Sequence, residues 1–484
     1  MATWTDLVQA AALSDRFLSA EYHSPHYRAL EQKLRQATRC VPLSSLAKSL
    51  FQGWSPSGGV KGESGVPAIK TKNLSCCTVS YEMDCAEVPD GAVPDRAWAV
   101  PGDIYVLRCA HHPRYIGKDI GRFDGHHLSK PFITEKIIVA RDVGASANDA
   151  YVTAFLQTDF GYQQIQRRLG GLTANYTPDD FGSVLVPVPD SRVQEFIGSK
   201  IELAERCRGR AGVLRGEAVA RFDDLLKLRV FRPGNKLTNV IEASALSDRL
   251  SGEFYLPRYF ALEAHLASLT VPVRPLRALL RCDVIRSSTP ERSDDAAVPC
   301  ILTSDIDPHE IRWRSPSLRV TQSVHDGHSG GLAPRDVVYT SVGPPVGEAA
   351  VVLPQFLPMA AGGDVSILRS GADLHPGFLA LYLNSVFGQM QNDRYSRGIR
   401  QRRVYPEDIG AFLIPVFSPK EQAYIGERIV RHQVLNELAV DYLNEAKADV
   451  EALIAGKLDT EAIIAGRLAA PSARDISELA KEGA

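Results

Sequence analysis

Apolar residues recur every three or four positions in two long stretches of the chain, one near its middle and one near its end. The first series is Ile197, Ile201, Ala204, Ala211, Ala218, Phe222 and Leu225, with Arg208 and Arg215 as interruptions. The second series is Ile425, Ile429, His432, Leu435, Ala439, Leu443, Ala446, Val450 and Leu453. This spacing predicts two long helices, each with an apolar seam of coiled-coil type. Burial against a neighbouring globular unit is the alternative explanation of the seams.

Shorter elements precede each long helix. Tyr27–Arg39 has the pattern of an amphipathic helix. Runs of apolar residues separated by Gly and Pro predict strands at 104–107, 136–139, 337–339 and 348–353. A helix follows in each half, containing Phe155-Leu156 in the first and spanning Leu379–Phe387 in the second. A short strand that ends at Pro187 or Pro415 comes next. This mixture of elements predicts an α/β (α+β) protein.

The two halves repeat one ordered set of motifs. Glu21-Tyr22, Pro25 and Tyr27 recur as Glu253-Phe254, Pro257 and Tyr259, each 232 positions later. Further matches keep an offset of 227 to 233 positions: Leu13–Arg16 with Leu246–Arg249 (233), Pro101-Gly102-Asp103 with Pro334-Arg335-Asp336, Pro178–Gly182 with Pro406–Gly410, and Val186-Pro187 with Ile414-Pro415. So many matches in one order indicate a duplicated domain.

We therefore predict a pseudo-twofold repeat of two homologous globular domains separated by long paired α-helices. The predicted boundaries are 1–37 for an N-terminal helical segment, 38–189 for the first globular domain, 190–236 for the central long helix, 237–268 for the helical segment of the second repeat, 269–416 for the second globular domain, 417–460 for the C-terminal long helix and 461–484 for a tail.

Composition narrows the setting. The formal net charge is −2, so any nucleic-acid contact requires positive charge to be gathered locally. The eight cysteines are scattered over 484 residues, which suggests reduced thiols. Met1–Gln9 lacks the pattern of a signal peptide, and no apolar run reaches the ~18 residues that span a bilayer. We expect a cytoplasmic protein that does not contact membranes.

Arginine and glutamine gather at equivalent places in the two halves, where they are suited to contact phosphates and base edges of DNA. The candidates are Arg394, Arg397, Arg400, Gln401, Arg402 and Arg403 in the second half, and Gln163, Gln166, Arg167 and Arg168 in the first. A solvated basic face is the alternative. A second candidate is the loop that carries Arg108, Arg114 and Lys118, which a mobile surface loop explains equally well. Its counterpart, Ser341–Gly347, is neutral.

Catalytic motifs are missing from the sequence. There is no Asn/Asp-Pro-Pro-aromatic loop of an adenine methyltransferase and no ATP-binding phosphate loop. The Cys and His spacings around Cys109 and His111-His112 match no standard zinc pattern. We expect a protein that is not an enzyme and binds no cofactor or metal.

The ordered motifs, from about Leu13 to Leu458, resemble those of the DNA-specificity (S) subunit of type I restriction–modification systems. The resemblance implies that 38–189 and 269–416 are target recognition domains, each reading half of a split, asymmetric site in double-stranded DNA. It implies that the helices act as a ruler and as docking surfaces for two DNA adenine methyltransferase subunits, which bind S-adenosylmethionine. It also implies that a motor/nuclease restriction subunit can join and that the S subunit does no chemistry.

Some features depart from the family pattern. Arg335 stands where the family usually has Gly in the Pro-Gly-Asp turn. The family also commonly has a Gln shortly after a Gly just before the final strand. Gly398 and Gln401 fit this pattern, whereas Gly171 is followed by Thr173 and no Gln. The tail repeats itself, Glu451–Leu458 recurring as Glu461–Leu468. Two alternatives remain open: an enzyme with an unrecognised active site, and a non-catalytic scaffold of another phage-defence complex that kept the fold without base reading.

Overall fold

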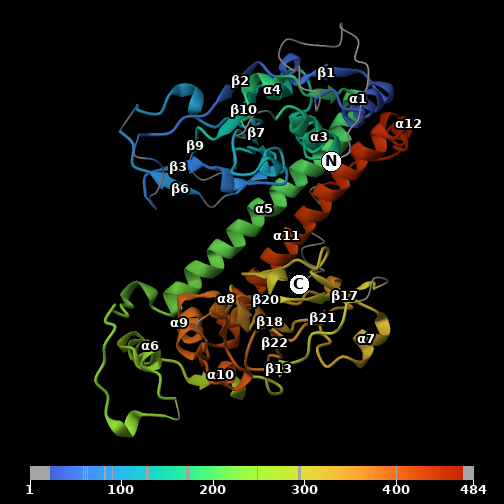
Figure 1. The fold of residues 1–484 in the computed structure, drawn as a ribbon. Helices are drawn as coiled ribbons and strands as arrows, with labels where there is room; N and C mark the ends of the chain where they lie inside the picture. The colour runs from blue at the N-terminus through green and yellow to red at the C-terminus, as the bar shows by residue number, and fades with distance from the viewer. Residues whose placement is uncertain are drawn as a thin grey trace. The chain divides into compact units, whose positions relative to one another are not determined.

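The computed structural model describes residues 22–57, 59, 62, 64–80, 83–89, 91–126, 130–169, 175–247, 249–292, 296–398 and 400–472. The chain forms two compact units. Unit 1 comprises the described residues within Met1–Gly209 and Glu437–Ile476, and unit 2 comprises those within Arg210–Asn436. Each unit holds one half of the repeat together with part of both long helices (Figure 1).

Unit 1 is built from small sheets and short helices. Its main sheet has the order β2-β10-β7-β8, formed by Ser49–Gln52, Ile137–Arg141, Ile104–Leu107 and Gly121–Arg122. A second sheet has the order β6-β3-β9, formed by Asp84–Ala86, Val66–Ile69 and Phe132–Ile133, with β3 and β9 parallel. Two pairs complete the strands: β1 (Cys40–Pro42) with β11 (Leu185–Pro187), and β4 (Leu74–Ser75) with β5 (Thr78–Val79). The helices are α1 (Pro25–Ala37), α2 (Asp149–Leu156), α3 (Asp159–Arg167) and α4 (Pro178–Gly182).

Unit 2 repeats this topology. Its main sheet has the order β13-β22-β18-β20, formed by Ile285–Arg286, Val365–Leu368, Val337–Thr340 and Ala349–Val351. The second sheet has the order β17-β14-β21, formed by Leu318–Val320, Val298–Ile301 and Ala360–Ala361, again with a parallel pair. Two pairs correspond to those of unit 1: β12 (Val273–Pro275) with β24 (Leu413–Pro415), and β15 (Ile306–Asp307) with β16 (Glu310–Ile311). The helices are α6 (Pro257–Ala267), α7 (Gln322–Gly327), α8 (Pro376–Asn384), α9 (Val386–Tyr395) and α10 (Pro406–Gly410). The matching strand orders confirm the predicted internal repeat and the mixed α/β fold.

The central strands of both main sheets carry the core. Tyr105 on β7 and Tyr339 on β18 are both fully buried. In unit 1, Tyr105 belongs to an apolar cluster with Ile69, Ile137 and Val139. Burial of such side chains is the main favourable contribution to folding, which explains why the apolar runs predicted as strands do form strands.

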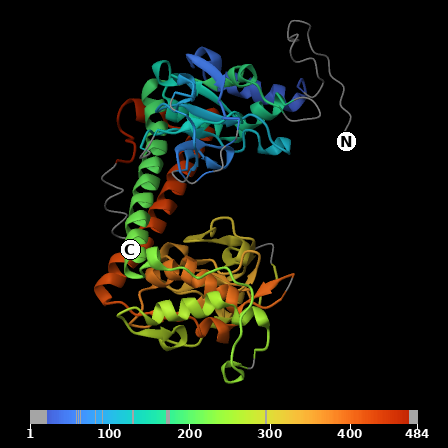
Figure 2. The same ribbon diagram turned by 90° about the vertical axis from the view of Figure 1, so that its left-hand side faces the viewer.

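Both long helices are confirmed, as α5 (Ser191–Leu225) and α11 (Pro419–Ile454), and they run side by side (Figure 2). In unit 1, Lys200 Nζ lies 2.7 Å from Asp449 Oδ2. In unit 2, Arg428 Nε donates to Glu217 Oε2 at 2.8 Å, which fixes an antiparallel pairing. The predicted seam residues are buried, except that His432 and Leu225 are half-buried and Leu226 takes the buried position at the end of the first series.

Three helix boundaries differ from the prediction. The predicted helix Leu379–Phe387 is two helices, because Ser385 ends α8 and its Oγ accepts a hydrogen bond from Gly388 at the start of α9. The central helix ends at Leu225 rather than near 236, since Lys227 adopts a left-handed φ of 52°. Helix α1 begins at Pro25, two residues before the predicted start, because proline suits the first helical turn.

The repeated tail sequence ends a helix twice. Gly456 and Gly466 have φ angles of 67° and 70°, the conformation that glycine adopts readily at helix ends. Lys457 N–H donates to Ala452 O at 2.8 Å, and Arg467 N–H donates to Ala462 O at 2.9 Å. The second copy forms the short helix α12 (Thr460–Ile464). The tail therefore turns twice instead of extending α11. Among the described helices, none has the length and hydropathy required to cross a membrane.

Candidate nucleic-acid interface

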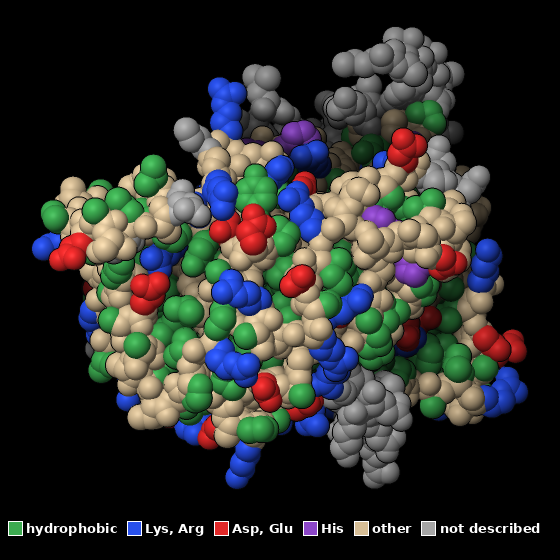
Figure 3. All heavy atoms as spheres, turned by 90° about the horizontal axis from the view of Figure 1, so that it is seen from below, with side chains coloured by type: hydrophobic (Ala, Val, Ile, Leu, Met, Phe, Trp, Pro, Cys, Tyr) green, Lys and Arg blue, Asp and Glu red, His purple; other side chains and the backbone are tan. Residues whose placement is uncertain are grey.

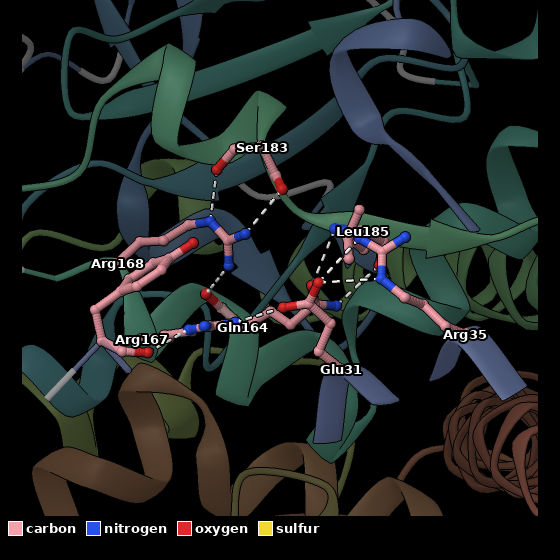
Figure 4. Close-up of polar contacts among 8 residues, drawn as sticks. Glu31, Arg35, Gln164, Arg167, Arg168, Ser183 and Leu185 are labelled. Carbon is pink, nitrogen blue, oxygen red and sulfur yellow. Dashed lines mark hydrogen bonds and ion pairs between the residues drawn. The ribbon is translucent and has the colours of Figure 1, made fainter. Parts of the chain in front are cut away.

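One candidate arginine of the first half is buried and joins α3 to α1. The Nη1 of Arg167 donates to Glu31 Oε2 at 2.9 Å, and its Nε donates to the main-chain oxygen of Tyr22 at 2.6 Å. The guanidinium lies 4.0 Å from the centre of the Tyr22 ring, and the side chain is 7% exposed. Figure 4 shows Glu31 between Arg35 and Arg167. We call this set of contacts the α1 clamp.

The second half contains the same arrangement, the α6 clamp. Arg394 Nη1 donates to Glu263 Oε1 at 2.5 Å, and its Nε donates to Phe254 O at 3.2 Å. The guanidinium lies 4.5 Å from the centre of the Phe254 ring, and the side chain is 9% exposed. A buried charge is retained only when it is paired and hydrogen-bonded. The clamps therefore explain why a glutamate (Glu31 or Glu263) and an aromatic residue (Tyr22 or Phe254) recur together with a buried arginine in both halves.

Arg168 is also buried. Its guanidinium donates to Ser183 Oγ and to the main-chain oxygens of Ser183 and Gln164, and burial lowers its pKa (Figure 4). The sequence placed Arg167, Arg168 and Arg394 on a surface that contacts DNA. The structure corrects that placement, because all three side chains are at most 9% exposed and donate hydrogen bonds to other residues of the same unit. They are therefore no longer candidates for the interface.

Two glutamines in the same helices have an equally structural role. Gln164 exchanges two hydrogen bonds with the main chain of Leu185, and Gln391 does the same with Leu413. Leu185 and Leu413 begin β11 and β24. Neither glutamine was predicted from the sequence, although the two are separated by 227 positions, as Arg167 and Arg394 are.

In the first half, the two sequence candidates lie against each other. Gln166 Nε2 donates to the main-chain oxygens of Pro113 and Ile116, at 3.1 and 2.7 Å, and thereby holds the loop that follows β7 against α3. The side chains of Arg114 and Lys118 are exposed on this loop. A hollow of about 450 Å³ beside the loop is lined in part by basic and aromatic residues, namely Lys72, His111, Tyr115 and Lys136.

The remaining first-half candidates are less exposed. Arg108 is half-buried, and its main-chain oxygen accepts a hydrogen bond from Tyr176 N–H. Gln163 is also half-buried and contacts Asp159 and His26 through its side-chain amide. These residues remain candidates at the edge of the surface.

The second half also brings its two candidate segments together. Strand β23 (Arg402–Arg403) pairs with β19 (Val342–Gly343), which belongs to the loop Ser341–Gly347. Gln389 Nε2 donates to Gly347 O at 2.7 Å and fixes the other end of that loop. The neutral loop Ser341–Gly347 and the arginine-rich segment 394–403 therefore form one surface, although the sequence predicted them as two separate segments.

This surface carries the exposed arginines. The side chains of Arg397 and Arg402 are 49% and 48% exposed, and each lies 2.8 Å from an aspartate, Asp408 and Asp393 respectively. Arg400 and Gln401 are exposed, and the described part of the chain offers neither side chain a hydrogen bond or ion pair. Arg403 is half-buried.

Gly398 adopts a φ of 95° in the turn before β23. A Cβ atom there would lie 2.4 Å from Gln401 O, so the turn needs glycine. The corresponding first-half positions, Gly171 and Thr173, lie outside the described residues.

On the face drawn in Figure 3, Lys and Arg side chains lie among acidic and apolar ones. No group of three or more His, Cys, Asp or Glu side chains among the described residues is arranged to hold a metal ion. The arrangement provides exposed guanidinium and amide groups on loops, which suits contact with phosphates and base edges.

The chain matches no known protein-family profile and no curated protein. It is similar to solved structures of low sequence identity. The HsdS subunit from Thermoanaerobacter tengcongensis is 18% identical, with a TM-score of 0.29 over 87% of this chain and 97% of that one. A type I restriction-modification S subunit from M. genitalium is 12% identical, with a TM-score of 0.43 over 86% and 94%. A structure describing complex assembly and conformational transition of the type I R-M system is 16% identical, with a TM-score of 0.29 over 87% and 97%.

Over most of its length, the chain is similar to type I restriction–modification S subunits.

Proposed function

We propose that the protein is the sequence-specific DNA-binding specificity subunit of a type I restriction–modification complex or a related phage-defence complex. Each recognition domain reads one part of a bipartite, asymmetric site. The chain itself performs no catalysis.

The observation that carries this proposal is the contrast between the shared and the divergent parts of the two halves. The buried clamps and strand orders are the same in both units. The loop surfaces are different: Arg114 and Lys118 are exposed in the first half, and Arg400, Gln401 and Arg402 in the second. Two copies of one fold with different polar loops suit the reading of two different half-sites, because base-edge contacts specify sequence.

The proposed partners follow from the proposed identity. Two DNA adenine methyltransferase subunits would bind the protein and supply S-adenosylmethionine and the methyl-transfer chemistry, and a motor/nuclease restriction subunit would join them. The long helices offer continuous surfaces for such docking. One of the similar structures concerns complex assembly in a type I R-M system.

Methylome sequencing tests the proposal in cells. Cells that carry this gene with its genomic neighbours are compared with cells that lack this gene alone. Loss of one split, asymmetric methyladenine motif on deletion is the expected result. An unchanged methylome, with the neighbouring methyltransferase shown to be active, would contradict a role in methylation.

The scaffold alternative makes a different prediction. A scaffold without base reading would bind its partner proteins but would not enrich any sequence from a random DNA pool. Selection with the purified complex, followed by sequencing, distinguishes the two. Enrichment of a motif with two fixed parts supports the specificity subunit, and an unenriched pool from a complex of full composition supports the scaffold.

A further inference from the structure

The two halves differ in charge at one equivalent corner, where the Pro-Gly-Asp turn meets the end of the main sheet. The corner is built alike in both: Lys48 N–H donates to Arg141 O in the first half, as Arg281 N–H does to Arg369 O in the second. The aspartate of the turn accepts from the arginine in both, Asp103 from Arg141 and Asp336 from Arg369. Differences between the corners are therefore differences of side chain on one framework.

In the first half, positive charge at the corner is neutralised internally. Lys48 Nζ lies 3.7 Å from Asp142 Oδ2. A second carboxylate, Asp149, lies beside Gly102, since a Cβ atom on Gly102 would be 2.4 Å from its Oδ2, and it is ion-paired with Arg122. All three guanidinium nitrogens of Arg141 donate hydrogen bonds, with Nη1 bound to Arg96 O.

In the second half, both of these carboxylates are replaced and an arginine is added. Ser370 stands in the place of Asp142, Pro376 in the place of Asp149, and Arg335 in the place of Gly102. Arg335 adopts the left-handed φ of 69° that the turn imposes, and its side chain contacts His375 and Glu427. Asp336 pairs with Arg369 and Glu427 pairs with Arg335, so of the three arginines at the corner only the charge of Arg281 is not offset by an ion pair with a described residue.

A hollow of about 390 Å³ at this corner is lined by Arg281, Arg335, Arg369 and Ser370, and also by Asp336, whose carboxylate accepts a hydrogen bond from Arg369. Arg281 is exposed, and the described residues provide no partner for its guanidinium. Arg369 uses Nε and Nη2 for its bonds to Asp336 and Gly331, and its Nη1 donates to no described residue. The Oγ of Ser370 is buried without a hydrogen-bond partner. A buried hydroxyl without a hydrogen-bond partner has an uncompensated desolvation penalty.

We propose that this hollow is an anion-binding site for a phosphate group, held by Arg281 and Arg369 with the hydroxyl of Ser370, and that the first half has no such site. Guanidinium groups match the tetrahedral oxygens of phosphate with paired, charge-assisted hydrogen bonds. The phosphate belongs either to a nucleic-acid backbone or to a free phosphate compound. The site does not depend on the proposed reading of DNA sequence, because phosphate binding is measured directly.

Isothermal titration of the full-length protein with inorganic phosphate tests the site, in chloride buffer of constant ionic strength. Ser370→Asp places in the hollow the carboxylate that the first half has at that position, and Arg281→Gln removes an exposed guanidinium. We expect each variant to bind phosphate at least about tenfold more weakly, which corresponds to about 1.4 kcal/mol. Lys48→Gln, at the equivalent first-half position, is the matched control and leaves phosphate affinity unchanged. Unchanged melting temperatures without phosphate show that the variants are folded.

The same variants identify the source of the phosphate. If Ser370→Asp weakens binding to all DNA sequences alike and lowers the salt slope by about one, the group is a backbone phosphate. If phosphate binding disappears while DNA affinity is retained, the ligand is a free phosphate compound. The proposal is overturned if the wild-type protein binds no phosphate beyond the effect of chloride, or if both variants keep wild-type affinity. It is also overturned if Ser370→Asp weakens only the binding of a partner protein, because the hollow then receives a carboxylate.

Discussion

The guanidinium of Arg394 on α9 lies 2.5 Å from the carboxylate of Glu263 on α6, and Arg167 on α3 and Glu31 on α1 form the corresponding pair in the first half. Because both arginines are nearly buried and also bond a main-chain oxygen, their removal leaves polar groups without partners. We expect Arg394→Ala and Arg167→Ala each to destabilise their own unit by about 2–3 kcal/mol, less than a fully buried pair because the glutamates are partly exposed.

Urea unfolding followed by hydrogen exchange in α6 or α1 measures this destabilisation. Arg35→Ala is the control, since Arg35 bonds Glu31 from a side chain that is 54% exposed. We expect a change below about 0.5 kcal/mol for it. Equal effects of Arg35→Ala and Arg167→Ala would show that burial does not set the strength of the clamp.

Exposed arginines of the second half should act on DNA binding without affecting folding. Arg400→Ala combined with Arg402→Ala removes two guanidinium groups from the loop surface. We expect weaker binding to the cognate site, with a salt slope that falls by about one for each DNA phosphate that the variant no longer binds. Fluorescence anisotropy over a range of salt concentrations measures both quantities. Arg274→Ala, an exposed arginine paired with Asp373, serves as control, and an unchanged slope in the double variant would exclude this surface.

The first-half turn should tolerate no side chain at Gly102. Its φ is 86°, and a Cβ atom would lie 2.4 Å from Asp149 Oδ2. We expect Gly102→Ala to lower the stability of unit 1 by about 1–2 kcal/mol or more. Gly91→Ala separates the two causes, since Gly91 has a φ of 74° but open space around it. Thermal unfolding should place Gly102→Ala below Gly91→Ala, and the reverse order would contradict the steric cause.

Unit 2 should lose stability in mild acid because of His309. Burial lowers the pKa of His309 to about 3, with His432 and Arg215 lowering it further. The folded state keeps this imidazole neutral, whereas the unfolded chain takes up a proton as the pH falls below about 6.5. The stabilisation is therefore complete above a pH of about 6.5 and disappears as the pH falls from there to about 3. From pH 7 to 5 the decrease is about 2 kcal/mol.

His309→Asn tests this pH dependence. His309 has a left-handed φ of 64°, which asparagine tolerates better than most residues. Urea midpoints at pH 7 and pH 5 should differ less in the variant than in the wild-type protein. A difference of the same size in both would assign the acid sensitivity to other groups.

The sequence predicted what periodicity and repetition can reveal. The seams of α5 and α11, the strands around Tyr105 and Tyr339, and the duplication all depend on local spacing or on matches between the halves. The role of Arg167 could not be predicted in this way. Its partner Glu31 lies 136 positions away in the sequence, and the local pattern of a basic run is the same for a solvated and for a paired arginine. The pairing of β19 with β23 was also missed, since two-residue strands leave no periodic pattern.

The candidate surface was therefore predicted only in part. Arg400, Gln401 and Arg402 are exposed as expected, whereas Arg167, Arg168 and Arg394 are internal. Binding of DNA by the exposed residues remains a prediction. Arginines at equivalent positions in the two halves suggested that both bind DNA in the same way. In the structure, the equivalent arginines form the buried clamps, and the exposed loops differ between the halves.

The two clamps also have a consequence for how such a gene can change. Each uses a glutamate, an aromatic residue and an arginine with the same atoms in contact. A crossover between the halves that joined α1 to the second globular domain would still bring a glutamate to an arginine. The fold thus contains compatible junctions, and recombination at them would exchange whole loop surfaces while leaving the buried polar network intact.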